Sequence, residues 1–174
     1  VNNNGGPPFK DFRDLTREAM LEGVVQNFVT PVELIQAVID GMAERGFGRI
    51  INITSMSVLM PIAGLDLSSG ARAGLTSFLA GVARTVASRN VTINNILPGK
   101  FDTDRLRANH TFVAERQGIP VEDVRQREAN NIPAGRLGTP EEFGAACAFL
   151  CSSQAGYITG QNLLIDGGVF PAAF

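Results

Sequence analysis

The chain has 174 residues, of which 44% are apolar and 18% are charged, and its formal net charge is −2 at pH 7. These values are typical of a globular chain that buries a sizeable core without a disulfide or metal staple. The slight negative charge argues against a nucleic-acid footprint and against a polybasic membrane patch. No window reaches the apolar length of a transmembrane helix. We therefore expect a single domain over residues 1–174, a cytoplasmic location, and neither a nucleic-acid nor a membrane partner.

The residues that could bind a metal are few. Cys147 and Cys151 lie four positions apart in a predicted helix and so face the same way. Because no His or Cys lies near them, two small core residues are favoured over a metal or redox pair. The single histidine, His110, stands in a polar, loop-like setting that predicts a surface position. We expect no metal site.

The chain opens on an apolar residue, Val1, which runs directly into an Asn/Gly/Pro-rich stretch at residues 2–8. This pattern is typical of the last residue of a strand followed by its loop. Residues 16–45 are rich in helix formers, and the glycines that follow should end the helix. Pro31 should kink or divide it, because proline lacks the backbone N–H that an interior helical position needs.

Two strands and a long helix are predicted next. Residues 49–54 are dense in β-branched side chains and nearly continuous in apolar character, which favours a strand buried on both faces. Residues 67–89 carry apolar side chains at helical spacing. Residues 91–97 form a second strand that Pro98-Gly99 ends.

The C-terminal third begins with a polar helical segment at residues 103–131, interrupted by Gly, Ile and Pro at residues 118–120, which we interpret as a lid of two short helices. Thr139 followed by Pro140 and two acids has the composition of a capped helix start. Residues 163–165 form a last strand.

Strands that alternate with helices at this spacing predict an α/β fold with a Rossmann-like, doubly wound parallel sheet. In such sheets ligands bind outside the carboxyl ends of the strands. Unusual residues follow the strands at these ends: the Asn-rich loop at residues 2–5, Ser55, and Pro98-Gly99. Their coincidence predicts a site.

The same segments resemble the short-chain dehydrogenase/reductase family over essentially the whole chain. The opening Asn2-Asn3-Asn4-Gly5 is similar to the family's NNAG loop, and residues 48–55 resemble the strand that delivers its active-site serine. Pro98-Gly99 with Thr103 resembles the PGxxxT segment beside the nicotinamide. Residues 132–142, 157–161 and 166–168 resemble the C-terminal signature, which is closest to that of 3-oxoacyl-(acyl-carrier-protein) reductases.

The resemblance implies hydride transfer between NAD(P)H and a carbonyl or alcohol, with an Asn, Ser, Tyr and Lys tetrad. Asn27 stands at the position of the asparagine that anchors a proton-relay water, and Ser55 at that of the serine that holds the substrate oxygen. Ser68 replaces the proton-transferring tyrosine, and Arg72 replaces the lysine. The cofactor-binding positions carried over are Asn3, Gly5, Arg72, Pro98, Gly99 and Thr103.

The Ser68 and Arg72 replacements change the chemistry, although i,i+4 spacing keeps both on one helix face. An aliphatic hydroxyl is a far weaker acid than a phenol, and Arg72 can donate to a ribose or carboxylate but cannot pass a proton on. Tyr157 belongs to another motif. Asp66 is a candidate stand-in for the tyrosine, although a helix-start residue is the favoured interpretation.

The glycine-rich TGxxxGxG loop, which would hold the pyrophosphate, does not occur in the sequence, so NAD and NADP stay open as cofactors. We interpret the chain as the C-terminal part of the fold, without its phosphate-binding half. Three functions stay open: an oxidoreductase of a small carbonyl or alcohol, with 3-oxoacyl compounds as one class; a catalytically impaired binding or scaffold protein; and a truncated fragment.

Two further expectations concern partners and substrate. The family resemblance implies a homodimer or homotetramer that pairs through helices around residues 23–45 and 67–89. The arginines of the lid fit an acidic or carrier-linked acyl substrate, and a solvated helix face explains them equally well.

Overall fold

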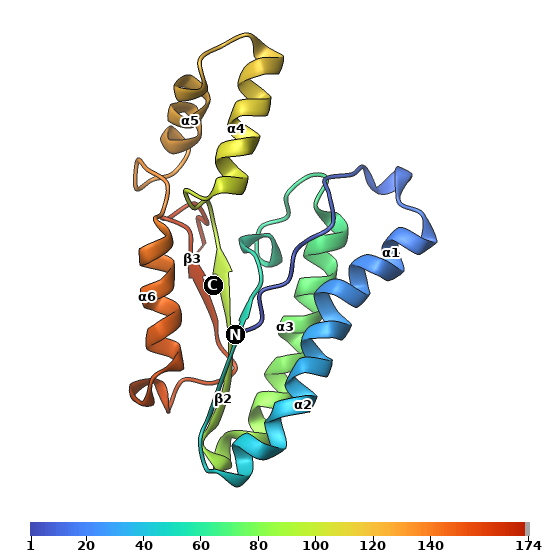
Figure 1. Ribbon diagram of the computed structural model, residues 1–174, viewed down its shortest axis with the longest axis vertical. Helices are drawn as coiled ribbons and strands as arrows, with labels where there is room; N and C mark the ends of the chain where they lie inside the picture. Colours follow the sequence, from blue (N-terminus) through green and yellow to red (C-terminus); the bar gives the residue numbers. More distant parts are fainter. Residues whose placement is uncertain (173–174) are drawn as a thin grey trace.

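The structure, a computed structural model, describes residues 1–172 and contains a parallel sheet with strand order β1-β2-β3. The strands are β1 (Gly48–Ile53), β2 (Val91–Pro98) and β3 (Asn162–Ile165). The longer helices are α1 (Arg17–Val24), α2 (Thr30–Glu44), α3 (Asp66–Val86), α4 (Asp104–Gln117), α5 (Val121–Asn130) and α6 (Pro140–Cys151). Helices lie on both sides of the sheet (Figure 1), which confirms the doubly wound α/β prediction.

The first residues of the chain extend the sheet beyond β1. Asn2 pairs in parallel with Asn52, donating its backbone N–H to the Ile51 carbonyl and accepting from the Ile53 N–H, both at 2.8 Å. This isolated bridge places Asn2 beside β1, next to the loop that follows. The same register brings one asparagine from each neighbouring segment into a row.

These asparagines form a ladder of side-chain amides across the sheet. Asn2 donates to Asn52 at 2.9 Å, and Asn52 donates to Asn95 of β2 at 3.2 Å. Asn95 donates in turn to Asn162 of β3 at 2.7 Å. Buried amides are costly unless they are hydrogen-bonded, so the asparagine ladder (Asn2, Asn52, Asn95 and Asn162) specifies the register of the strands.

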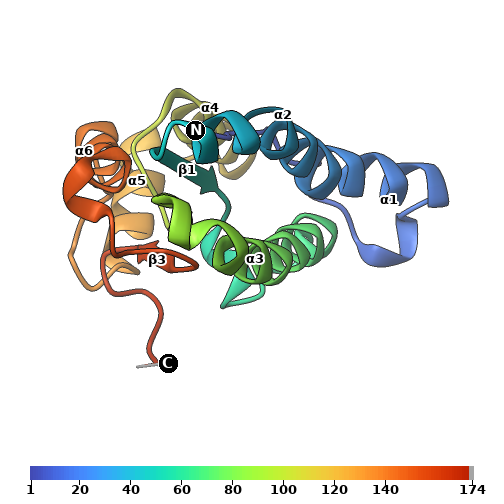
Figure 2. The same cartoon turned by 90° about the horizontal axis from the view of Figure 1, so that it is seen from below.

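The sheet lies between α2 and α3 on one side and α6 on the other (Figure 2), and an apolar core fills each side. The core under α2 and α3 consists of Ile35, Ile50, Leu75, Leu79, Ala83 and Ile93. The core under α6 consists of Ile51, Ile96, Leu150 and Ala155. Cys147 and Cys151 pack against this second core, which confirms the prediction that they are core residues. Successive residues of β1 thus face opposite cores, as a strand buried on both faces requires.

The long N-terminal helical stretch is divided as predicted, by a π-helical segment, η2 (Val25–Val29), between α1 and α2. Proline has no N–H, so Pro31 cannot donate to the Asn27 carbonyl four residues back. The Thr30 N–H instead reaches the Val25 carbonyl, five residues back. The helix therefore changes its hydrogen-bond spacing ahead of the proline.

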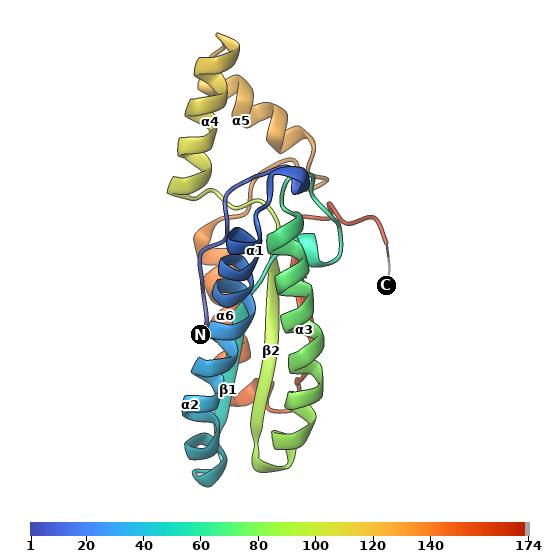
Figure 3. The same cartoon turned by 90° about the vertical axis from the view of Figure 1, so that its right-hand side faces the viewer.

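Helices α4 and α5 form a pair that projects beyond the carboxyl ends of the strands (Figure 3). The Thr103 side chain caps α4, and the left-handed Gly118 ends it. The prediction that His110 is a surface residue is wrong: it is only 3% exposed, between α4 and α5, where its Nε2 contacts Glu128. A carboxylate partner on the second helix makes the burial of the imidazole tolerable.

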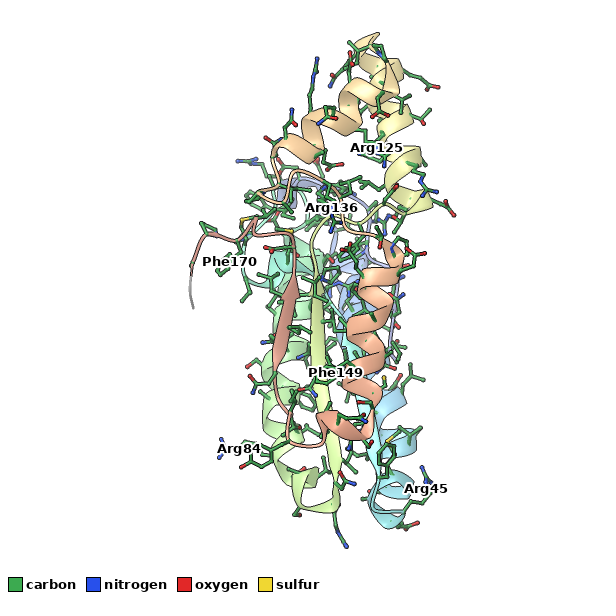
Figure 4. All side chains as sticks on the ribbon, turned by 90° about the vertical axis from the view of Figure 1, so that its left-hand side faces the viewer. Arg45, Arg84, Arg125, Arg136, Phe149 and Phe170 are labelled. Carbon is green, nitrogen blue, oxygen red and sulfur yellow. The ribbon has the colours of Figure 1, made fainter. Side chains whose placement is uncertain are left out.

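Helix α6 begins at Pro140, as predicted, with a capping box between Thr139 and Glu142. Arg136 reinforces this start through hydrogen bonds of 2.8 and 2.6 Å to the Glu142 carboxylate. Figure 4 labels Arg136 in the connection between α5 and α6. The hydrogen bonds from Arg136 and then from the Thr139 N–H lower the pKa of Glu142 to about 2. Within residues 1–172, no helix is long and apolar enough to cross a membrane.

Candidate active site

A cleft of about 590 Å³ lies at the carboxyl ends of the strands. The three segments that the sequence placed at these ends all reach it: the loop after Asn2, the Ser55 turn, and Pro98-Gly99. The first turns of α3 and α4 complete its walls. The three segments therefore meet at one cleft, as predicted from their places at the strand ends.

Ser55 follows β1 directly and lines the cleft. Its extended backbone makes it the residue before a short 3-10 turn, Met56–Val58, and its Oγ accepts a hydrogen bond from the Ser57 N–H at 3.1 Å. Because the oxygen already accepts this bond, the hydroxyl hydrogen remains available to donate to a molecule in the cleft.

Ser68 and Arg72 lie one turn apart in α3 and both line the cleft, as the i,i+4 spacing predicts. Both are buried, at 7% and 8% exposure. Arg72 donates from Nε to Ser68 Oγ at 3.2 Å. The Ser68 hydroxyl hydrogen, like that of Ser55, therefore remains available to the cleft.

The guanidinium of Arg72 also joins α3 to two other segments. It donates from Nη1 to the Ile53 carbonyl at 2.8 Å, and from Nη2 to the Asn4 carbonyl at 3.1 Å, with the Gly5 carbonyl at 3.5 Å. Burial, and then the charge of Arg105, lower the pKa of Arg72. All three guanidinium nitrogens thus donate to the protein itself. We call this set of contacts the Arg72 clasp.

Asn27 is buried in η2 and does not line the cleft. It is 1% exposed, and its Nδ2 donates to the Gly23 carbonyl at 3.2 Å. Its Oδ1 has no hydrogen-bond partner among the described residues. Asn4 connects η2 to the cleft. Its side chain lines the cleft and donates a hydrogen bond to the Gln26 carbonyl of η2 at 2.8 Å.

Of the positions carried over for cofactor binding, Asn3, Pro98, Gly99 and Thr103 line the cleft, whereas Gly5 does not. Gly99 is required by packing, since a Cβ there would lie 2.7 Å from Cα of Asp166. This contact joins the Pro98-Gly99 turn to the segment after β3. The two signature segments therefore support each other physically.

Two charged cleft residues, Lys100 and Arg105, were not among the catalytic or cofactor-binding candidates from the sequence. Lys100 pairs with Glu128 at 3.0 Å. Burial opposes the ionisation of Glu128, but hydrogen bonds from His110 and Lys100 outweigh it and hold its pKa below the ordinary value. Proximity in sequence could have indicated both residues, since Lys100 lies within the segment from Pro98 to Thr103 and Arg105 lies two residues after it.

The candidate stand-in for the missing tyrosine, Asp66, does not line the cleft. Asp66 is exposed in the first turn of α3, which agrees with the favoured interpretation as a helix-start residue. Tyr157 is fully exposed and does not line the cleft either.

The family model described as Enoyl-(Acyl carrier protein) reductase matches residues 1–170. The chain belongs to the short-chain dehydrogenase/reductase family. Among curated relatives, this short-chain dehydrogenase/reductase is 38% identical over 148 residues to 3-oxoacyl-(acyl-carrier-protein) reductase FabG of Vibrio harveyi, covering 84% of this chain and 56% of the relative. It is 35% identical over 169 residues to an acetoacetyl-CoA reductase of Cupriavidus necator, covering 97% and 64%.

Solved structures place this short-chain dehydrogenase/reductase in the same fold. YwfH, an NADPH-dependent reductase involved in bacilysin biosynthesis, is 31% identical with a TM-score of 0.91, covering 98% of this chain and 66% of that structure. The F189W actinorhodin polyketide ketoreductase with NADPH is 26% identical with a TM-score of 0.88, again covering 98% and 66%. The chain thus spans a little over half to about two thirds of the length of these relatives.

Proposed function

We propose that this chain is part of an NAD(P)-dependent oxidoreductase that interconverts a carbonyl and an alcohol by hydride transfer on a 3-oxoacyl-type substrate. The observation that carries the proposal is the cleft, in which Ser55, Ser68 and Pro98-Gly99 come together at the strand ends. Two relatives are named as reductases of 3-oxoacyl and acetoacetyl thioesters, and two solved relatives as NADPH-dependent or NADPH-bound reductases.

The residues present fit one end of NAD(P). Pro98, Gly99 and Thr103 form a wall of the cleft at the carboxyl end of β2, on the side where a nicotinamide would lie in this proposal. When bound, NAD(P)H supplies the hydride. Within residues 1–172, no glycine-rich loop joins a strand to a helix N-terminus, which is the arrangement that holds a pyrophosphate. The proposal therefore assigns the nicotinamide end of the cofactor to these residues, and leaves the choice between NAD and NADP open.

Ser55 and Ser68 have the chemistry to hold a substrate oxygen. Each hydroxyl oxygen already accepts a bond from the protein, so each hydroxyl hydrogen can be donated to a carbonyl. The Arg72 guanidinium, behind Ser68, strengthens that donation as negative charge develops on the substrate oxygen. In this proposal the serines orient the carbonyl and stabilise the charge, and Arg72 is a positioning residue.

Proton transfer is the weaker part of the reaction. Ser68 is an aliphatic hydroxyl and Arg72 remains charged, so neither works as a general acid near neutral pH as well as a tyrosine and lysine pair. We expect slow turnover for this reason. We also propose that α4 and α5, within a lid over residues 103–131 of a single domain, cover the substrate, and that the contact of Lys100 with Glu128 holds this helix pair against the cleft.

The deciding experiment measures NADPH and NADH oxidation by the protein with acetoacetyl-CoA and a broad panel of other carbonyl compounds. Ser55→Ala should abolish any reduction, because it removes a donor to the substrate oxygen. Ser153→Ala is the matched control, since Ser153 is exposed and lies outside the cleft. Binding of the dinucleotide without reduction of any carbonyl would refute the proposal.

A second candidate function, a binding protein that retains the fold without the reaction, is favoured by the Arg72 clasp. The guanidinium donates from each of its nitrogens to the chain's own hydroxyl and carbonyl groups, and Ser68 stands where a tyrosine would transfer the proton. The double variant Ser68→Tyr with Arg72→Lys should then create carbonyl reduction where the natural protein has none. Reduction by the unmodified protein would contradict this alternative.

A further inference from the structure

The cleft at the strand ends has walls of a single charge sign. Three cationic residues line it: Arg72, Lys100 and Arg105. Among its described lining residues there is no Asp or Glu. Low-dielectric walls that carry one sign of charge concentrate the field inside a cleft and attract ligands of the opposite sign.

The three positive charges are not compensated equally. Lys100 has an anionic partner, Glu128, at 3.0 Å. Arg72 is bonded only to neutral groups, so its hydrogen-bond donors are satisfied while its charge is not balanced. Arg105, which is exposed, forms no ion pair within residues 1–172.

Arg105 is also close enough to Arg72 for their charges to interact. Its positive charge is the second cause, after burial, of the lowered pKa of Arg72. Arg105 lies in the first turn of α4, whose N-terminal N–H groups add to the positive potential. An anion between the two guanidiniums would relieve this repulsion, and the Arg105 guanidinium donates to no other group within residues 1–172, so it is available to bind one.

Hydroxyl donors and an apolar surface surround these cations. Ser55 and Ser68 each present an unused hydroxyl hydrogen to the cleft. The remaining wall is largely apolar, formed by Phe9, Ile53, Met56, Ile62, Leu65 and Leu106. The cleft therefore combines two oxygen-binding serines, an unpaired guanidinium and an apolar lining.

We propose that the substrate of this cleft is an oxo compound that carries its own oxyanion, a carboxylate or a phosphate ester, and that Arg105 binds this anion while Ser55 and Ser68 hold the carbonyl. A guanidinium binds either oxyanion through two parallel hydrogen bonds. Arg105 is thus a specificity-determining residue. The inference rests on the proposed function in taking this cleft as the substrate site, and it names the class of substrate.

Binding measurements on the protein without nucleotide test the inference. Acetoacetate, dihydroxyacetone phosphate and methyl acetoacetate are titrated separately and followed by calorimetry. The first carries a carboxylate, the second a phosphate and the third no charge. At least one of the two anions should bind about tenfold more tightly than the neutral ester, as expected for charge-assisted hydrogen bonds. Which anion binds more tightly identifies the oxyanion.

The variant Arg105→Gln should remove the preference for the anion and leave the affinity for methyl acetoacetate unchanged. Arg116→Gln is the matched control, because Arg116 lies on the same helix outside the cleft and should retain the preference. Should Arg105→Gln fail to fold, raising the salt concentration with the natural protein tests the positive charge of the cleft as a whole, since added salt should weaken binding of the anions and not of the neutral ester.

Equal affinities for all three compounds, no binding of either anion, or a preference that survives in Arg105→Gln or at high salt would overturn the inference. The measurement involves no turnover. A protein that reduces no carbonyl but shows the Arg105-dependent preference therefore refutes the oxidoreductase and retains the anion site. A protein that reduces carbonyls without that preference does the reverse.

Discussion

Replacing Arg72 by methionine removes the Arg72 clasp while keeping most of the buried volume. The two shorter bonds that join α3 to other segments, to the Ile53 carbonyl at 2.8 Å and the Asn4 carbonyl at 3.1 Å, are both lost, as is the contact with the Gly5 carbonyl at 3.5 Å. With a charged donor each contributes about 1.5–3 kcal/mol. The variant also no longer buries a guanidinium, whose desolvation already lowers its pKa, and this gain offsets part of the loss.

We therefore expect Arg72→Met to lower the free energy of unfolding by about 2 kcal/mol. In a chain of this size that change corresponds to a fall of about 4–8 °C in Tm. Thermal unfolding followed by circular dichroism measures it. The control is Arg84→Met, an exposed arginine on the same helix (Figure 4), which should change stability by less than about 0.5 kcal/mol. Equal stability of Arg72→Met and the natural chain would refute the role of the clasp.

Three further predictions concern packing and pH. Asn95→Ala, in the middle of the asparagine ladder, should cost about 1–3 kcal/mol in urea unfolding, and Asn162→Ala, at its exposed end, should cost less. The pKa of Glu128 is lowered, so its stabilising contacts are present above the ordinary pKa of 4.5 and are lost as pH falls through the pKa of the folded state. Glu128→Gln should therefore lower the free energy of unfolding at neutral pH but not in strong acid. Gly99→Ala should destabilise the fold by about 1–3 kcal/mol, because the added Cβ would lie too close to the backbone of Asp166. Gly144→Ala, in open space on α6, should stabilise it by about 0.5–1 kcal/mol. Chemical denaturation measures both changes.

Each of these predictions has a clear contrary result. An equal loss of unfolding free energy in the two asparagine variants would show that the buried amide of Asn95 contributes no more to stability than the exposed one. A constant effect of Glu128→Gln at every pH would show that its charge is not what stabilises the helix pair. A neutral Gly99→Ala would show that the turn can move away from the segment after β3.

The elements of the fold were predictable because their signals are local. The β-branched run at residues 49–54 and the helical spacing at residues 67–89 correspond to β1 and α3 within one residue at the start and a few at the end. Pro31 indicated a divided helix because its missing N–H acts on its own neighbours. The convergence of Ser55 and Pro98-Gly99 followed from the general geometry of parallel sheets.

What the sequence could not predict depends on contacts between distant segments. His110 looked like a surface residue because its neighbours in sequence are polar, but its burial depends on Glu128 of another helix. The spacing placed Arg72 beside Ser68, yet its bonds to the Ile53 and Asn4 carbonyls exist only once three segments have folded together. The uncompensated charge of Arg105 is likewise a property of the assembled cleft.

The asparagine ladder has a direction. Every amide donates toward the next segment, from Asn2 through Asn52 and Asn95 to Asn162. Backbone carbonyls fix this sense, because Nδ2 of Asn2 also faces the Pro31 carbonyl at 3.5 Å and that of Asn52 the Asn94 carbonyl at 3.4 Å. Rotating one amide by half a turn would bring two donors or two acceptors face to face, so the amides can reverse only together. The ladder is thus a cooperative, polarised chain whose dipoles add across the sheet.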